Sequence, residues 1–170
     1  MGDIKLYATP KNNEKKFNAD ELLVTKTNTK GIITYANQAF IHIIGLEEEE
    51  LVGKPHNIIR HPDMPKVVFK LLWDALKSEN EIHAYVKNLC ADGSYYWVMA
   101  NVTPSYFNGK VIGYHSARRA PTKNALNIIE PLYQKLLSAE KRGGIAASEK
   151  ILNDLLEEKG MEYEEFILSI

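Results

Sequence analysis

The sequence contains a single cysteine, Cys90, so no disulfide can form within the chain. One free cysteine is typical of a protein that works in a reducing compartment. No apolar run approaches the roughly 18 residues that cross a bilayer. The N-terminus carries several lysines but no hydrophobic signal core. These absences predict a cytoplasmic protein without direct membrane insertion.

The chain also lacks an excess of either charge. It has 21 Lys and Arg against 22 Asp and Glu, and its only adjacent basic residues are pairs such as Lys15-Lys16 and Arg118-Arg119. We therefore expect no electrostatic field that would recruit nucleic acid. A glycine-rich phosphate loop, a nucleophile elbow and a Cys–His motif are missing from the sequence as well, which argues against an enzyme.

The 170 residues are 45% hydrophobic and 25% charged, which suits one globular domain with an appendage. Residues 1–20 are polar and aperiodic and are interpreted as an N-terminal arm. Residues 21–120 contain the β-rich and helical patterns of a domain. Residues 121–170 show apolar stripes at helical spacing, interrupted by Gly143-Gly144 and Gly160, and predict a C-terminal helical extension.

The domain alternates between β-forming and helical segments. Three helices, in residues 37–45, 47–53 and 66–80, separate the second predicted strand from the third. This order predicts an α+β fold, with a five-stranded antiparallel sheet, helices on one face and a cavity between the two layers. The predicted strands are Leu22–Thr27, Ile32–Ala36, Glu81–Leu89, Ser94–Thr103 and Lys110–Ala117.

Four stretches of the sequence resemble the PAS domain of the Aer-type aerotaxis (energy-taxis) sensors. Over residues 20–120 they are ITYANQAF, HNIIRHPDMPK, VKNLCADGSYYWV and GKVIGYHSARR, and EPLY follows at 130–133. The resemblance implies non-covalently bound FAD and a redox or oxygen signal passed to the chemotaxis machinery. It also implies the split arrangement of the CetB kind, in which a PAS protein works with a separate membrane-bound, methyl-accepting-type transducer. Such a partner would hold the protein at the inner membrane.

The resemblance places the cofactor motif at Arg60, His61 and Asp63. A guanidinium fork and an imidazole suit the diphosphate of FAD, and a carboxylate can accept from a ribose hydroxyl or hold Arg60. Asn57 and Ile59, beside this motif, are further candidates, with Ile59 covering the isoalloxazine ring. This cationic motif favours FAD over FMN.

Two asparagines on neighbouring strands, Asn88 and Asn101, are candidates for the polar edge of a flavin. Ile82 stands where many Aer-like sensors have a tryptophan, so a different aromatic side chain must stack on the ring. The candidates for that contact are Tyr85, Trp73 and Trp97.

Other interpretations of the same residues remain open. Asp63 could cap the following helix, Arg60 could pair with Glu47–Glu50, and His56 could be a loop residue. His56, His61 and Asp63 are also metal-ligand types, although their loop is broken by prolines. His42 or His115 could serve as an axial ligand if the domain bound haem b instead of FAD.

A PAS domain can also lack a cofactor altogether. The chain would then act as a docking or dimerisation adaptor, with a homodimer as one outcome. In either case the tail helices, the arm and the link at 118–123 are the expected contacts with a partner. The tail helices could equally pack on their own domain.

Overall fold

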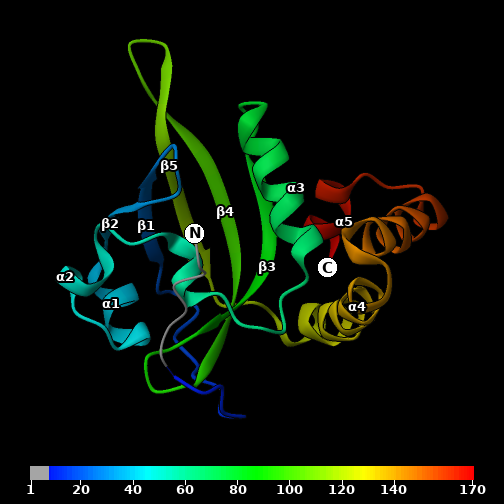
Figure 1. Ribbon diagram of the computed structural model, residues 1–170, viewed down its shortest axis with the longest axis horizontal. Helices are drawn as coiled ribbons and strands as arrows, with labels where there is room; N and C mark the ends of the chain where they lie inside the picture. Colours follow the sequence, from blue (N-terminus) through cyan, green and yellow to red (C-terminus); the bar gives the residue numbers. More distant parts are fainter. Residues whose placement is uncertain (1–7) are drawn as a thin grey trace.

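The computed structural model describes residues 8–170, and residues 1–7 of the predicted arm lie outside this range. The described strands form one antiparallel sheet in the order β2-β1-β5-β4-β3, which confirms the predicted α+β fold (Figure 1). The strands are β1 Leu23–Asn28, β2 Ile33–Ala36, β3 Ile82–Leu89, β4 Tyr95–Phe107 and β5 Lys110–Arg119.

A tight turn joins β1 to β2. Asn28 Oδ1 accepts hydrogen bonds from the backbone N–H groups of Lys30 and Ile32. Gly31 has a φ of +78°, a conformation that side chains disfavour and glycine adopts freely. The polar tetrad with a terminal glycine therefore forms the hairpin that the sequence predicts.

Strand β4 is longer than its prediction of Ser94–Thr103. Pro104, the residue after the predicted end, cannot donate to a ladder. In the structure Pro104 pairs with Tyr114, and after a bulge the pairing continues to Phe107. Pairing with β5 therefore extends β4 beyond Pro104.

Four helical segments lie on one face of the sheet: α1 Gln38–Ile44, α2 Glu48–Leu51, the 3-10 helix η1 His56–Ile59, and α3 Lys66–Lys77. Asn37 begins α1 by accepting a hydrogen bond from Phe40 N–H, and Gly45 ends it with a φ of +73°. Figure 1 shows α1 and α2 near β1 and β2, while α3 runs along β3 and β4. The cavity of this fold is lined by residues of η1, α3 and the sheet.

The C-terminal extension forms α4 Lys123–Lys159 and α5 Tyr163–Ser169 at the β3 edge, beside α3 (Figure 1). Tyr133 of α4 is buried, and its hydroxyl donates to the Tyr85 carbonyl of β3 at 2.6 Å. Gly144 interrupts α4 with a φ of +70° and a ψ of −167°. Within residues 8–170 no helix combines the length and apolarity that crossing a membrane requires.

Part of the N-terminal arm is bound to the turn between β3 and β4. The Lys11 N–H donates to the Gly93 carbonyl at 2.8 Å, and the Lys15 N–H to the Tyr95 carbonyl at 2.7 Å. Asn13 accepts in return from the Tyr95 N–H. These bonds place residues 11–15 alongside the start of β4.

Candidate functional site

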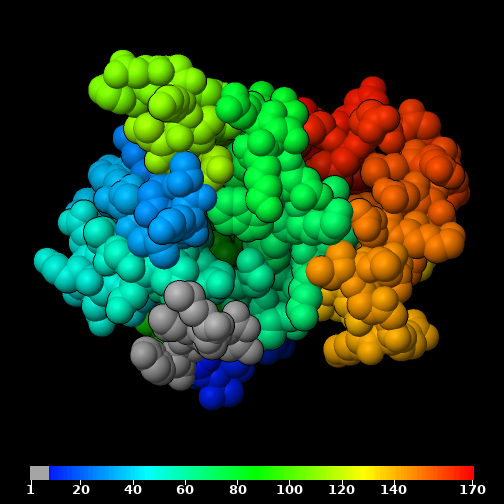
Figure 2. Space-filling view, turned by 45° about the horizontal axis from the view of Figure 1, so that its top comes forward, coloured from blue at the N-terminus to red at the C-terminus, as the bar shows by residue number. Residues whose placement is uncertain are grey.

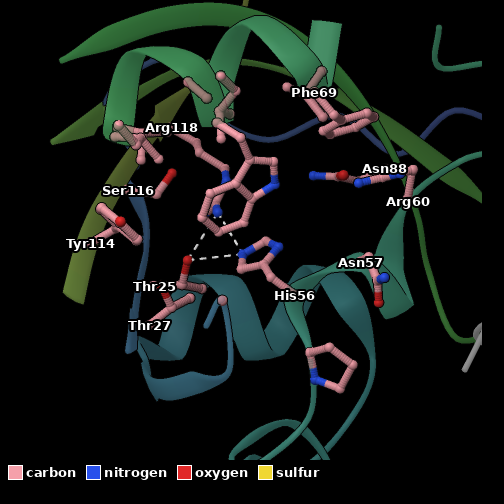
Figure 3. A pocket seen from close by; sticks show the side chains of 18 of the residues that line it. Thr25, Thr27, His56, Asn57, Arg60, Phe69, Asn88, Tyr114, Ser116 and Arg118 are labelled. Atoms are coloured by element: carbon pink, nitrogen blue, oxygen red, sulfur yellow. Dashed lines mark hydrogen bonds between the residues drawn. The ribbon is translucent and has the colours of Figure 1, made fainter. Parts of the chain in front are cut away.

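A cavity of about 180 Å³ lies between the sheet and the helices η1 and α3. In Figure 2 the surface is hollowed between the β1–β2 segment, in blue, and α3, in green. Figure 3 shows the side chains that point into the cavity. Its lining residues are Thr25, Thr27, Lys30, Gly31, Pro55, His56, Asn57, Arg60, Phe69, Leu72, Trp73, Leu76, Val86, Asn88, Ala100, Val102, Tyr114, Ser116 and Arg118.

One side of the cavity is built around Arg118 of β5, which is only 4% exposed. Its Nη2 donates to His56 Nε2 at 2.7 Å and to Thr25 Oγ1 at 2.9 Å, as the dashed lines of Figure 3 show. Because a guanidinium can only donate, His56 Nε2 must act as the acceptor, so the ring proton of neutral His56 is on Nδ1. This geometry holds His56 in one tautomer.

Burial determines the charge states of His56 and Arg118. Burial, together with the positive charge of Arg118, lowers the pKa of His56 to about 3, so His56 is neutral at physiological pH. Burial also lowers the pKa of Arg118 to about 10, which still leaves the guanidinium charged at neutral pH. The cavity therefore contains a fixed, nearly dry positive charge.

No carboxylate among the described lining residues balances this positive charge. Its ionisable side chains other than His56 and Tyr114 are the cations Lys30, Arg60 and Arg118. Two buried polar atoms that face this space, Arg118 Nη1 and Ser116 Oγ, also lack a hydrogen-bond partner among the described residues. Because unpaired buried donors are costly, such a site favours an anionic or acceptor-rich ligand.

Arg60, Phe69 and Asn88 gather on another side of the cavity (Figure 3). The Arg60 guanidinium lies 3.5 Å from the centre of the Phe69 ring, a cation–π stack. The backbones of Arg60 and Asn88 form an isolated antiparallel bridge. The Asn88 side chain donates to the Tyr96 hydroxyl at 3.3 Å and is 3% exposed. Arg60 stacks here rather than pairing with Glu47–Glu50.

The rest of the predicted cofactor motif lies outside the cavity. Asp63 has a 60% exposed side chain that pairs with Lys87 Nζ at 2.7 Å. His61 is buried, and its Nδ1 accepts a hydrogen bond from the Asp63 backbone N–H. The His61 ring also packs edge-on against Tyr95. These bonds fasten the loop after Arg60 to β3 and so place Arg60 at the cavity.

The other predicted residues divide between the two faces of the sheet. Asn57 and Trp73 line the cavity, as do Arg60 and Asn88. Ile59 is buried in the core beside it. Trp97 packs on Tyr133 of the extension, on the opposite side of the sheet.

Two further residues of the β3–β4 pair also lie away from the lining. Asn101 hydrogen-bonds Glu81 and His83. Ile82, at the position where the resemblance implies a tryptophan, packs with Leu76 and Val102. Of the aromatic candidates for stacking, Trp73 alone is at the cavity.

The positions of the histidines give less support to haem b or to a metal ion as the bound group. Neither His42 nor His115 lines the cavity, and the histidine that does, His56, has its Nε2 bonded to Arg118. Across residues 8–170 no three His, Cys, Asp or Glu side chains come together as metal ligands would. Cys90 is buried away from the lining, and burial raises the pKa of its thiol to about 11, so it stays protonated.

Sequence reasoning missed the main polar group of the site. It treated His56 as a loop or metal residue and gave Arg118 only the role of a link. One signal was available: Tyr114, Ser116 and Arg118 alternate along β5, so they share one face of the sheet. Their contact with Thr25 follows from the β1–β5 register, in which Thr25 pairs with Ser116.

Comparison with known proteins agrees with this architecture. The family model described as "PAS fold" matches residues 33–118, more than half of the chain. The chain is 41% identical over 117 residues to the aerotaxis receptor of Escherichia coli (strain K12), an alignment that covers 69% of this chain and 23% of the receptor. The chain thus spans about a quarter of that relative's length.

Solved structures share the fold at low identity. A light-oxygen-voltage domain, from a study of a flavin analogue, superposes with a TM-score of 0.56 at 16% identity, covering 63% of this chain and 81% of that one. A PAS domain from Colwellia psychrerythraea gives 0.54 at 21% identity, covering 60% and 87%. Together with the family match, these findings show that the chain belongs to the PAS fold family, and that its PAS domain is similar to that of an aerotaxis receptor.

Proposed function

We propose that this protein binds FAD in the cavity beside Arg118 and acts as a redox or oxygen sensor in energy taxis. Its signal would go to a separate, membrane-bound, methyl-accepting-type chemotaxis transducer. The similarity to the aerotaxis receptor supports the aerotaxis role. The light-oxygen-voltage neighbour, whose study used a flavin analogue, supports the choice of a flavin.

The observation that carries this proposal is the buried guanidinium of Arg118 with an unpaired Nη1. A bound flavin supplies redox chemistry, since its ring accepts electrons and gains negative charge. Arg118 Nη1 and Ser116 Oγ, which lack partners among the described residues, would hold such a ring through its acceptor atoms. Arg60, Lys30 and Asn57 offer further donors for the phosphates, and Trp73 and Phe69 offer aromatic faces.

The size of the cavity limits how the ring enters. At about 180 Å³ it is smaller than the roughly 300–1,000 Å³ usual for ligand pockets. A flavin ring therefore requires the wall to move outward. We assign this movement to helix α3, which contributes Phe69, Leu72, Trp73 and Leu76 to the wall.

An absorption spectrum of the purified protein tests the proposal. A flavin band, with FAD released by heat and identified by chromatography, is the expected result. FMN in place of FAD would show that the cationic residues do not select the longer cofactor. A strong Soret band would indicate haem b. Colourless protein that accepts no added flavin would reject the sensor proposal and leave a cofactor-free docking or dimerisation adaptor.

A chimera tests the biological role. This chain's residues 20–120 would replace the matching segment of the Escherichia coli aerotaxis receptor. Cells that gather at an air interface would support a sensor role, and an Arg118→Met chimera should fail to respond while reaching the same level in the membrane. For the native pairing, crosslinking of the full chain to a methyl-accepting transducer is the expected result. A chain that crosslinks only to a second copy of itself would contradict the proposed partner.

A further inference from the structure

The carboxylate of Glu140, on α4, caps the N-terminus of α3. Its Oε2 accepts from the Lys66 N–H and its Oε1 from the Val67 N–H, both at 2.9 Å. The residue at the start of α3, Pro65, gives no side-chain cap of its own. Glu140 therefore supplies, from another helix, the acceptors and the negative charge that a helix N-terminus favours.

The same carboxylate also joins the two halves of α4. Ser148 is fully buried, and its hydroxyl lies 2.9 Å from two acceptors, Glu140 Oε1 and the Ile145 carbonyl, so that its one proton can go to either. Between Glu140 and Ser148 lies Gly144, whose backbone angles belong to a region that is essentially restricted to glycine. Glu140 thus connects α3, the first half of α4 and the second half across a break in the helix.

The segment after the break, residues 145–170, contacts two walls of the cavity. Glu149 pairs with Lys70 of α3 at 2.9 Å. Glu164 of α5 accepts from the His83 N–H of β3 at 2.7 Å and pairs with the His83 ring at 2.8 Å. Figure 1 shows this segment beside α3 and β3. Both elements also contribute cavity residues.

Both halves of α4 are packed on the domain. Before the break, Ala125, Ile129, Tyr133 and Leu136 are buried in the core; after it, Leu152 of α4 and Phe166 and Ile167 of α5 are buried in the same core. The contact of the first half with β3 includes the buried bond from Tyr133 to the Tyr85 carbonyl. Pro131 removes one backbone donor within this half, but helical backbone angles continue up to Gly144. A displacement of α3 would strain the contacts on either side of Gly144.

We propose that residues 145–170 form a hinged arm, and that Glu140 is the positioning residue that couples the arm to the cavity wall. When α3 shifts outward to admit a ligand, the bonds from Lys66 and Val67 to Glu140 lengthen, and the bond from Ser148 weakens with them. The arm then swings about Gly144 while the first half of α4 stays on the sheet. The hinge is independent of the ligand's identity, and its redox dependence rests on the proposed flavin.

Hydrogen–deuterium exchange of the full chain tests the hinge. Glu140→Gln keeps the size of the side chain but replaces one acceptor oxygen with a donor that faces a backbone N–H or the Ser148 hydroxyl. We expect exchange in residues 145–170 and in the first turn of α3 to rise about tenfold, with residues 123–143 unchanged. Glu158→Gln, on the exposed side of α4, is the matched control. Unchanged exchange at 145–170 in Glu140→Gln would overturn the proposal.

Ser148→Ala is a milder variant, because it removes the hydroxyl that is shared between Glu140 and the Ile145 carbonyl and leaves the α3 cap in place. It should speed exchange in 145–170 but not in α3. If Glu140→Gln does not fold, this variant decides the outcome, and wild-type exchange in its arm would reject the hinge.

A second experiment compares flavin-loaded protein in the oxidised form and after reduction by dithionite. We expect exchange in 145–170 to differ between the two forms in the wild type and not in Glu140→Gln. Equal exchange in both forms, with flavin bound, would reject the coupling. A protein without flavin would instead refute the proposed function through its spectrum, and the Glu140→Gln comparison would still decide whether the hinge exists.

Discussion

Arg118 donates a 2.7 Å hydrogen bond to His56, and no carboxylate among the described cavity residues balances its charge. A buried cation without a counter-ion lowers the stability of a fold, because its desolvation is not repaid. We therefore interpret the buried charge of Arg118 as functional: the fold loses some stability and keeps a positive charge that a ligand can bind.

Replacing Arg118 separates stability from binding. Arg118→Met keeps an apolar stem and removes the charge, so we expect flavin content to fall at least tenfold, since charge-assisted bonds contribute about 1.5–3 kcal/mol. The free energy of unfolding of the cofactor-free protein should stay equal or rise. Absorbance and urea unfolding measure the two quantities. Loss of stability with retained flavin would contradict the assigned role of Arg118.

His56 should make the fold sensitive to mild acid. Its pKa is about 3 in the folded protein against an ordinary 6.5, so below pH 6.5 the unfolded chain binds a proton that the native state refuses. The contribution of His56 is complete above pH 6.5 and declines as pH falls toward 3. The stability lost between pH 7 and pH 5 is about 2 kcal/mol. Urea unfolding at pH 7 and 5 should show this loss, and His56→Gln should reduce it by a similar amount.

The sheet and its helices could be predicted from local patterns, because turn glycines and periodic apolar residues act within a few positions. The site was harder to predict. Arg60 and Asn88 were found through the motif and through strand position. Arg118 was not, since its partners Thr25 and His56 are brought to it by the β1–β5 register and by η1.

The motif RHPDMP shows why neighbours in sequence need not share a site. Arg60 faces the cavity, whereas Asp63 turns outward to Lys87. A ligand role for Asp63 was inferred from the family resemblance and from the ability of a carboxylate to accept from a ribose hydroxyl, but the Asp63 side chain is bound to Lys87 of β3 instead. Its cavity role, in this geometry, is to hold the loop that presents Arg60.

That positioning role predicts a non-additive pair. Asp63→Asn and Lys87→Met should each lower the free energy of unfolding by at most about 1 kcal/mol, because Asp63 is largely exposed. Each should reduce flavin retention less than Arg118→Met does. The double variant should be no worse than either single variant, as expected for partners in one ion pair. Additive losses would show that Asp63 acts on the cofactor independently of Lys87.

Gly31 lies against the Trp73 ring at the cavity. It has a φ of +78°, and a Cβ added there would lie 3.2 Å from the Trp73 ring at the cavity. Gly109 has a φ of +72° with open space around it, so Gly109→Ala costs only the backbone strain of a positive φ. Both variants should lose roughly 1 kcal/mol of stability from the backbone. Gly31→Ala should additionally displace Trp73, which changes tryptophan fluorescence and flavin retention. Equal behaviour of the two variants would show that Trp73 yields freely and does not define the mouth of the cavity.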